Sequence, residues 1–329
     1  MKHWLARMFG GARDGAQDGA QQAPATAPTS MAHGAADDAS PIVDLDLAFF
    51  HWLAGPHVSG QASADNLVLD ELARLARDPQ GAAALVPRVP AVIPQLLRSL
   101  RDEGSSSGEL ARLLAQDAVL VAEVIREVNS PYYQPATPVR NLEGALLLLG
   151  QNGLRMLLAR VAFRPIISLQ AGPLARQVAP QLWRQSEQCA LAAALLAPRH
   201  GADAFAAYLA GLMHNIGLVV ALRMVDQLLP AGGLPDDDVF GQRLVQGARL
   251  LSAAIAGQWE LPPAIGHAIA HLGDPQGLPA ALGEADRLAK LQMLAAGGHP
   301  DFVRAVQALA PHARQVYDKL LEKNREQEA

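Results

Sequence analysis

The sequence predicts an all-α protein built as a bundle of many helices. Half of its 329 residues are hydrophobic and only 5% are aromatic, and much of the apolar share is Ala and Leu, which are strong helix formers. From Pro94 to Leu321 nearly every segment repeats its apolar residues at the three- and four-residue spacing of a helix. No segment there sustains the period of two that a half-buried strand requires, so a sheet is not expected.

Charge and cysteine content narrow the class of protein. The 27 basic and 32 acidic side chains give a formal net charge of -5, which argues against a dedicated binder of polyanions. The single cysteine, Cys189, excludes an internal disulfide framework and a cysteine-rich zinc site. The N-terminus lacks the apolar stretch of a secretory signal, and His214 and Asn215 interrupt the uncharged stretch from Ala204 to Leu222. We therefore expect a soluble, cytoplasmic protein without an integral membrane segment.

The first 40 residues are predicted to form a disordered tail. Residues 10–40 consist mainly of Ala, Gly, Gln, Asp and Pro with almost no large apolar side chain, so they cannot offset the entropy of folding. Residues 1–9 could form a short amphipathic helix that touches a membrane or a partner. A frayed terminus is the simpler interpretation of these nine residues.

Residues 41–86 are predicted to form an N-terminal helical extension. Its first helix carries Phe49, Phe50 and Trp52 on an apolar face and ends at Gly55, which precedes a proline. Three aromatic side chains on one short helix need burial. We therefore expect this helix to pack on the main domain.

A second helix of the extension is predicted over 65–77, with Asp65 as its N-cap. Three prolines then lie close together, at Pro87, Pro90 and Pro94. Because the residue before a proline avoids the helical region, this segment is expected to be extended. The main domain is predicted to begin there.

Helices are predicted from this boundary to near the C-terminus. Ser106 and Glu109 have the spacing of a capping box, and Asp117 can cap the helix that ends at Asn129. The later helices are mostly separated by connections with Gly, Pro or Asp, and those within 282–329 are expected to close the bundle. They are predicted at 141–149, 152–169, 173–199, 203–213, 217–229, 237–258, 263–272, 280–296 and 301–322, followed by a frayed tail from Glu322 to Ala329.

Three groups of segments, in order along the chain, resemble the HDOD domain, a relative of the metal-dependent HD phosphohydrolases that occurs in bacterial signalling proteins. The resemblance covers about Pro87 to Ala281 and implies an HD-like multi-helix bundle over 87–281. The segments that carry it are 110–117 with 123–133; 141–145 with 149–150 and 153–155; and 182–186 with 210–217, 259–262 and 269–271.

The first of these segments ends in a polar and aromatic loop, Asn129-Ser130 followed by Tyr132-Tyr133. A polar turn at the end of a helix is common without any function. As a family marker, Asn129 is expected to hydrogen-bond loop backbone. Tyr132 and Tyr133 either form an aromatic patch that faces a partner or pack the loop itself.

The resemblance also implies where a metal centre would lie. An HD hydrolase holds metal ions with histidines and aspartates from several helices, and the metal activates water. Here Gln185 stands at the position of the first histidine, and the central His-Asp pair is His214-Asn215. Ala248 stands near the position of a third histidine. A neutral Asn attracts a cation much less than an Asp does, so the centre is degenerate and no metal or other cofactor is expected.

Three candidate ligands remain, namely His214, His271 and Asp286. They could meet in a pocket and hold a metal, or His214 and Asp286 could be a buried hydrogen-bonded pair that keeps the helices in register. The second interpretation needs no metal. His267 and His271 share a helix face at the spacing of some zinc ligands, but two ligands are an incomplete site and a helix surface explains them better.

Other sequence features do not point to catalysis. Cys189 lies on an apolar helix without a basic neighbour on its own face, so it is not expected to act as a nucleophile. The run Asp236–Asp238 begins a predicted helix, where capping and the helix dipole favour acidic residues. The sequence contains neither a phosphate-binding glycine loop nor a Gly-x-Ser-x-Gly elbow.

The favoured interpretation is a noncatalytic module of bacterial signal transduction that binds a protein partner or a small ligand. The alternative is a residual metal-dependent phosphohydrolase that acts on a nucleotide or cyclic dinucleotide. A nucleic-acid partner is not expected, because the net charge is negative and aromatic residues are not interleaved with the candidate basic residues. Those basic residues are Arg98, Arg101, Arg155, Arg160 and Arg164.

Overall fold

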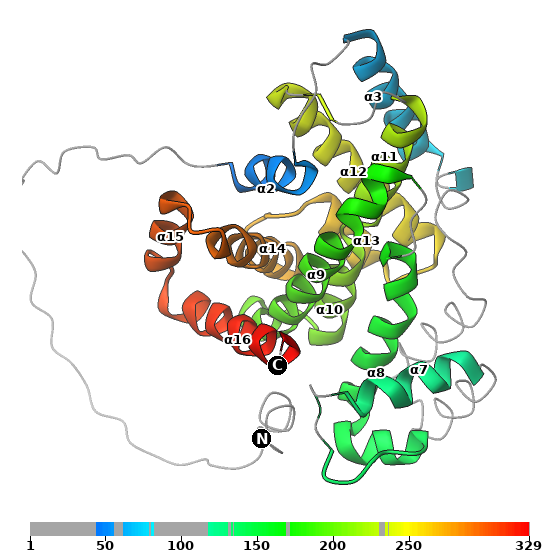
Figure 1. The fold of residues 1–329 in the computed structure, drawn as a ribbon, viewed down its shortest axis with the longest axis vertical. Coiled ribbons are helices and arrows are strands. Elements are labelled where there is room, and N and C mark those ends of the chain that lie inside the picture. The colour runs from blue at the N-terminus through cyan, green and yellow to red at the C-terminus, as the bar shows by residue number, and fades with distance from the viewer. Residues whose placement is uncertain are drawn as a thin grey trace, which may run out of the picture.

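The computed structural model consists of helices joined by turns and loops in all the parts that it describes, which confirms the all-α prediction (Figure 1). It describes residues 44–55, 62–78, 80–81, 118–130, 133, 135–168, 172–229, 234–235 and 237–328. The predicted tail over residues 1–40 and the predicted capping box at Ser106 and Glu109 lie outside the described residues. The same holds for the prolines at the predicted domain boundary.

The helices follow the predicted order. They are α2 (Leu45–Ala54), α3 (Ala62–Arg77), α7 (Ala118–Val128), α8 (Leu142–Ser168), α9 (Pro173–Leu196), the short 3-10 helix η1 (Ala197–His200), α10 (Ala204–Met213), α11 (Ile216–Leu228), α12 (Asp238–Gln258), α13 (Pro263–Ala270), α14 (Gly277–Ala296), α15 (Pro300–Gln307) and α16 (Pro311–Glu328).

Aspartate side chains begin several of these helices. Asp44 caps α2, Asp203 caps α10 and Asp237 caps α12, each by accepting backbone N–H groups with its carboxylate. The capping interpretation of the acidic run at the start of α12 is confirmed for Asp237. Asp236 lies outside the described residues.

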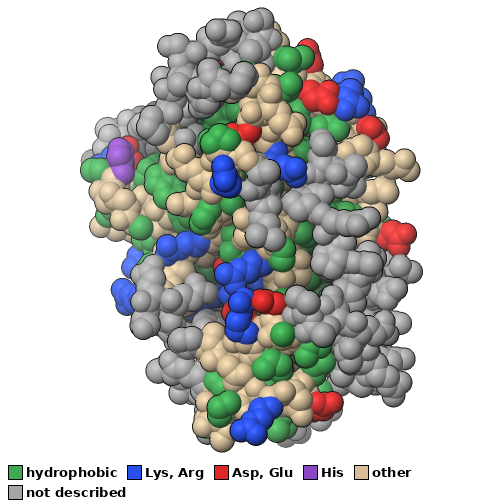
Figure 2. Space-filling model, turned by 45° about the vertical axis from the view of Figure 1, so that its right-hand side comes forward, with side chains coloured by type: hydrophobic (Ala, Val, Ile, Leu, Met, Phe, Trp, Pro, Cys, Tyr) green, Lys and Arg blue, Asp and Glu red, His purple; other side chains and the backbone are tan. Residues whose placement is uncertain are grey.

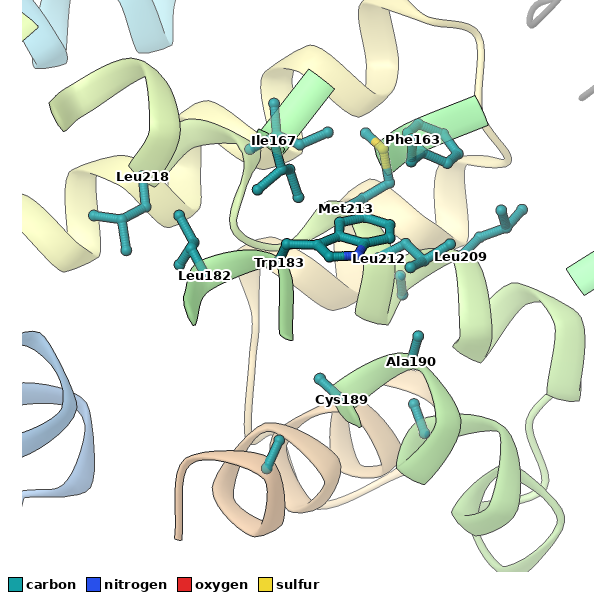
Figure 3. Close-up of a cluster of buried hydrophobic side chains, with 14 of the residues drawn as sticks. Phe163, Ile167, Leu182, Trp183, Cys189, Ala190, Leu209, Leu212, Met213 and Leu218 are labelled. Carbon is teal, nitrogen blue, oxygen red and sulfur yellow. The ribbon is translucent and has the colours of Figure 1, made fainter. Parts of the chain in front are cut away.

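Helix α9 is the central element of the fold. It contacts α8, α10, α11, α14 and α16, and Figure 1 shows it in the middle of the molecule. A Cβ atom on Gly211 of α10 would lie 2.4 Å from the Cα of Ala190 in α9, so a glycine is required where the two helices meet. Buried side chains such as Trp183, Leu209 and Met213 fill the space between α8, α9, α10 and α11 (Figure 3).

Helix α8 combines two predicted helices. Its backbone leaves the helical region at Gly150, with φ 70° and ψ 175°, so the predicted helices 141–149 and 152–169 meet at a kink. Two apolar stretches, Leu142–Ser168 and Ala204–Leu228, are long enough to span a bilayer by length and composition, but 50% and 89% of their apolar windows are buried in the protein. Such burial is typical of core helices, and the two stretches are weak evidence for a membrane span.

The N-terminal extension packs on the main domain. Helix α2 contacts α9, α12 and α14, and α3 contacts α11 and α12. Phe49 and Phe50 are buried as expected, but Trp52 is 42% exposed. The expectation for Trp52 is wrong because this residue lies on the outer side of α2, where its ring stacks on Phe49 with 5.6 Å between the ring centroids.

The C-terminal region differs from the prediction in two ways. The single helix expected over 301–322 is broken into α15 and α16, because a proline at position 311 fits only the first turn of a new helix. The tail expected to fray from Glu322 is helical to Glu328. It is held because Asn324 is buried against α9 and accepts a hydrogen bond of 3.0 Å from Gln188.

One carboxylate fastens this region to the bundle. Glu284 of α14 accepts hydrogen bonds from His200 of η1 at 2.9 Å and from His312 of α16 at 2.8 Å. Three segments that are distant in the sequence therefore meet on one side chain. The contact is partly exposed, so its main effect is on how α16 is placed.

Close packing at the start of α11 gives a first test. A Cβ atom on Gly217 would lie 1.9 Å from the carbonyl oxygen of Ala248 in α12, so we expect Gly217→Ala to cost about 3 kcal/mol of folding free energy or more. Urea unfolding followed by circular dichroism measures the change. Gly257→Ala in α12 is the matched control, because nothing lies within 4 Å of its added Cβ and the change is expected to be neutral or slightly stabilising. Equal stability of the two variants would contradict the described contact between α11 and α12.

Candidate functional site

Four residues at predicted metal-ligand positions, Gln185, His214, Asn215 and Asp286, lie in a buried polar centre between α9, α10, α11 and α14. Gln185 and Ser186 come from α9, and His214 and Asn215 form the two-residue turn between α10 and α11. Asp286 comes from α14. All five residues are buried, with exposures of 0 to 8%. Buried polar groups need partners, so the hydrogen bonds of this centre determine what it can do.

His214 connects the turn to α14. Its Nδ1 lies 2.6 Å from the carbonyl oxygen of Gly211, which can only accept, so Nδ1 carries a proton. Its Nε2 lies 3.2 Å from Oδ1 of Asp286. The predicted pair of His214 and Asp286 is therefore present, and it joins α10 to α14.

Asp286 is the hub of the centre. Its Oδ1 accepts a hydrogen bond of 2.7 Å from Gln185, and its Oδ2 lies 2.5 Å from the ammonium of Lys290, one turn further along α14. Burial alone would raise the pKa of this carboxyl, but Lys290 and His214 outweigh burial and lower the pKa below its ordinary value. The ammonium of Lys290 and the hydrogen bond with His214 thus hold this carboxylate in its ionised form.

The two amides at predicted ligand positions bind each other. Asn215 donates from Nδ2 to Oε1 of Gln185 and, at 3.1 Å, to Oγ of Ser186. Gln185 in turn donates to Asp286. The amides therefore form a chain of hydrogen bonds from the turn to α14, and their N–H groups are directed at oxygens that could otherwise face a cation.

Ala248 lies next to the centre but contributes only backbone. Oγ of Ser252 lies 2.7 Å from the carbonyl oxygen of His214 and 3.1 Å from that of Ala248, and it accepts a hydrogen bond of 2.8 Å from the N–H of Gly217. Ser252 is fully buried. Sequence reasoning missed Ser252, although a serine on the apolar face of a helix is a usable signal because it needs a buried partner.

His271 does not join His214 and Asp286, which corrects the predicted three-ligand pocket. It follows the last residue of α13 and is exposed, with its Nδ1 3.0 Å from the carbonyl oxygen of His267. The two imidazoles stack with 4.2 Å between their centroids. These contacts agree with the interpretation of His267 and His271 as a helix surface, and the physical reason is that α13 turns this end toward solvent.

The donor set of the centre does not fit a metal ion. Cys189, His214 and Asp286 offer ligand atoms within 4.8 Å of one another, and they are the one such group among the described residues. Burial raises the pKa of the Cys189 thiol well above its ordinary value, so the sulfur is not the thiolate that binds metals. The carboxylate already holds the ammonium of Lys290. A divalent cation would have to displace that charge.

Lys290 extends the centre to the N-terminal helix. Its Nζ lies 2.7 Å from Oδ1 of Asp46 in α2, and Oδ2 of the same carboxylate lies 2.7 Å from the guanidinium of Arg249 in α12. Burial alone would lower the pKa of Lys290, but the carboxylates of Asp286 and Asp46 outweigh burial and raise it. Sequence reasoning missed Lys290. Its i, i+4 spacing from Asp286 was the available signal.

The loop after α7 is organised as expected by Asn129. This side chain donates to the carbonyl oxygens of Ile125 at 2.8 Å and Val139 at 2.7 Å, and it accepts a hydrogen bond of 2.8 Å from the N–H of Val139. The hydroxyl of Ser130 is buried and makes no hydrogen bond within the described residues. Asn129 therefore holds the two ends of the loop together, which is a structural role.

The aromatic part of the loop packs inward where it is described. Burial raises the pKa of Tyr133 to about 12, and its hydroxyl hydrogen-bonds Arg160 of α8. Of the two interpretations of these tyrosines, this contact supports packing of the loop itself and not an aromatic patch that faces a partner. Tyr132 lies outside the described residues.

Arg160 lies in a second charged cluster and is not part of a basic surface. Its guanidinium lies 2.8 Å from Glu127 and also pairs with Glu187, and its side chain is only 12% exposed. Figure 2 shows Lys and Arg side chains beside Asp and Glu side chains at the middle of one face, which agrees with paired charges. Arg155 lies over the ring of Phe205, 4.6 Å from its centroid. These contacts count against a phosphate-binding role for the two arginines.

Fold and centre together define a helical domain of the HD type in which two amides stand at expected ligand positions and a lysine pairs with the remaining carboxylate. A family model described as HDOD domain matches residues 86–275. The match covers more than half of the chain, and the chain belongs to this family. The family is related to the HD phosphohydrolases, which confirms the resemblance stated from the sequence motifs.

A curated protein and solved structures are also similar to this chain. An uncharacterized protein of Treponema pallidum (strain Nichols) is 25% identical over 190 residues, which are 54% of this chain and 35% of that protein. The chain thus matches about a third of the length of this curated relative. A solved HDOD domain protein with unknown function from Geobacter sulfurreducens is 24% identical, with a TM-score of 0.55 over 78% of this chain and 96% of that one.

A second solved structure shows the same fold. It comes from Shewanella amazonensis SB2B and carries the provisional name of a metal-dependent phosphohydrolase. It is 19% identical to this chain, with a TM-score of 0.53 over 79% of this chain and 99% of its own. At this identity the likeness concerns the fold alone.

The pairing of Lys290 with Asp286 can be tested by removing first the ammonium alone and then both charges. Lys290→Met leaves a buried carboxylate without its cation, so we expect it to cost about 3–5 kcal/mol of folding free energy. Lys290→Met combined with Asp286→Asn removes both charges and is expected to recover at least about 1 kcal/mol of that loss. Urea unfolding at pH 7 measures both variants. A double variant less stable than Lys290→Met alone would refute the pairing.

Lys323 of α16 provides a test by pH. Burial lowers its pKa from 10.5 to about 8, so the folded protein releases this proton at a lower pH than the unfolded chain does. Below pH 8 the burial of the charge destabilises the fold, and between about pH 8 and 10.5 this cost is lost as pH rises. We expect Lys323→Met to be more stable than the unsubstituted protein at pH 7, and the difference to shrink toward pH 10.5.

Urea unfolding at pH 7, 9 and 10.5 of both proteins measures this difference. Lys319→Met on the same helix, at a less buried position, is the control for the loss of a lysine. A stability difference for Lys323→Met that stays constant across the series would show that burial does not act on the charge of Lys323.

Proposed function

We propose that this protein is a noncatalytic, cytoplasmic module of bacterial signal transduction that binds a protein partner or a small ligand through its degenerate HD-type domain. The observation that carries the proposal is the ammonium of Lys290 at 2.5 Å from Asp286, the one carboxylate that remains at the expected centre. Hydrolysis of a phosphate ester by a metal centre needs a cation that activates water. A lysine cannot replace it in that role.

The rest of the centre supports the same proposal. Gln185 and Asn215 are neutral and bind each other, so the two positions supply little attraction for a cation. The surrounding side chains are almost fully buried, so the described residues cover Asp286 from solvent. A domain of this kind can still keep the packing of its relatives, because hydrogen bonds hold the helices where metal ligation would have.

The alternative function is a residual metal-dependent phosphohydrolase that acts on a nucleotide or cyclic dinucleotide. It is favoured by the one cluster of three potential ligand atoms, from Cys189, His214 and Asp286. In this case a metal would have to displace the ammonium of Lys290 from Asp286. It would also have to replace the proton on the thiol of Cys189, which would be released to solvent. The two functions therefore differ in a measurable quantity, the metal content of the protein.

The test is the metal content of the purified, untagged protein after exposure to Mn²⁺, Fe²⁺, Mg²⁺ and Zn²⁺ in separate samples. We expect less than about a tenth of an equivalent of each after removal of free metal, because the centre carries its own cation. The same is expected of His214→Ala and Asp286→Ala. Inductively coupled plasma mass spectrometry gives the values.

A rebuilt centre is the positive control. Gln185→His with Asn215→Asp and Lys290→Ala restores two ligands and removes the ammonium, so this variant is expected to bind more metal than the unsubstituted protein. Near-stoichiometric metal in the unsubstituted protein, lost in both His214→Ala and Asp286→Ala, would overturn the proposal and support the phosphohydrolase.

A further inference from the structure

Two cations of the main domain surround one carboxylate of the N-terminal helix. Lys290 contacts Oδ1 of Asp46 and Arg249 contacts Oδ2, both at 2.7 Å. The side chain of Lys290 is 7% exposed and that of Arg249 is 25% exposed. Each oxygen of the carboxylate thus has its own cation, which is how proteins hold a bound carboxylate or phosphate group.

The carboxylate comes from outside the family domain. Asp46 is separated from Arg249 by 203 positions and from Lys290 by 244. It precedes the matched segment, which begins at residue 86. Arg249 lies within the matched segment and Lys290 follows it in α14, whereas their shared carboxylate is supplied by α2 at the N-terminal side (Figure 1).

Asp46 is also the most accessible member of the group. Its side chain is 38% exposed, so solvent reaches the carboxylate from outside while the cations lie beneath it. Displacement of this carboxylate would take from each cation the Asp46 oxygen that it contacts here.

We propose that Lys290 and Arg249 form an anion-binding site for the carboxylate or phosphate group of a small ligand, and that Asp46 is its internal occupant. The ligand and Asp46 compete for the same two cations. Because Lys290 also holds Asp286, a bound anion is linked directly to the buried centre. The two cationic side chains bind the ligand electrostatically, and no metal is needed.

Other contacts of α2 make the proposal testable in the full-length protein. Phe49 and Phe50 are buried, and His51 contacts Asp238 of α12 at 2.9 Å. Helix α2 is therefore held at several points besides Asp46. Asp46→Ala is expected to vacate the anion site without releasing the helix.

The experiment is rescue of Asp46→Ala by inorganic phosphate and by acetate, measured as the thermal unfolding midpoint of protein freed of divalent metal on a chelating resin. Chloride at equal ionic strength corrects for general salt effects. We expect a saturable rise of about 2–4 °C at ten times the dissociation constant. Isothermal titration should give an affinity at least about tenfold higher for Asp46→Ala than for the unsubstituted protein, in which Asp46 competes.

Two further variants separate an anion site from a simple ion pair. Asp238→Ala removes the contact of α12 with His51 of α2 and leaves Asp46 on Lys290 and Arg249, so no saturable rise is expected. Asp46→Ala combined with Arg249→Gln keeps the vacancy but loses one cation, and the rise should fall by at least half. An Asp46→Ala protein that responds to phosphate and acetate no more than Asp238→Ala would overturn the proposal.

The proposal rests on the small-ligand branch of the proposed function, and the two can fail separately. The anion experiment is done without divalent metal, whereas the metal-content experiment uses no anionic ligand. Absence of rescue leaves the noncatalytic assignment untouched. Metal binding by the unsubstituted protein would overturn that assignment without changing the measured anion affinity.

Discussion

A buried carboxylate that must stay charged is the constraint on which the centre of this protein depends. An ionised carboxylate cannot remain in an apolar interior without a compensating charge and hydrogen bonds. In a metal-dependent relative a cation from solution could supply that charge. Here Lys290 supplies it from the same helix, and Gln185 and His214 complete the shell around Asp286. The contacts of this one group join α14 to α9 and to the turn that follows α10.

The substitutions at the expected ligand positions are consistent with one another. A lone amide in place of a metal ligand would leave a buried polar group unpaired, at a cost of about 1–3 kcal/mol. Gln185 and Asn215 avoid that cost because each satisfies the other. Close backbone contacts keep them in register, since Gly211 lets α10 touch α9 and Gly217 lets α11 touch α12. The centre is a complete polar network of its own kind.

Local patterns in the sequence predicted the helices well, because helical spacing, glycine and proline act over a few residues. The kink at Gly150 and the burial of Phe49 follow from such patterns. The contacts that define the centre do not. The pairing of Asp46 with Lys290 joins residues 244 positions apart, and no local periodicity contains it. His271 was chosen by residue type, but whether a histidine points inward depends on how α13 ends.

The polar centre is completed by helices that flank the segment matched by the family model. The family match ends at residue 275, yet Asp286 and Lys290 follow it and Asp46 precedes it. The matched segment contributes His214, two amides and Arg249, but neither the buried carboxylate nor the lysine that balances it. The charges of the centre are balanced only when α2 and α14 are packed in place. The centre therefore depends on helices outside the matched segment. A change that reaches α2 therefore acts on the same charges that hold α9 and α14 together.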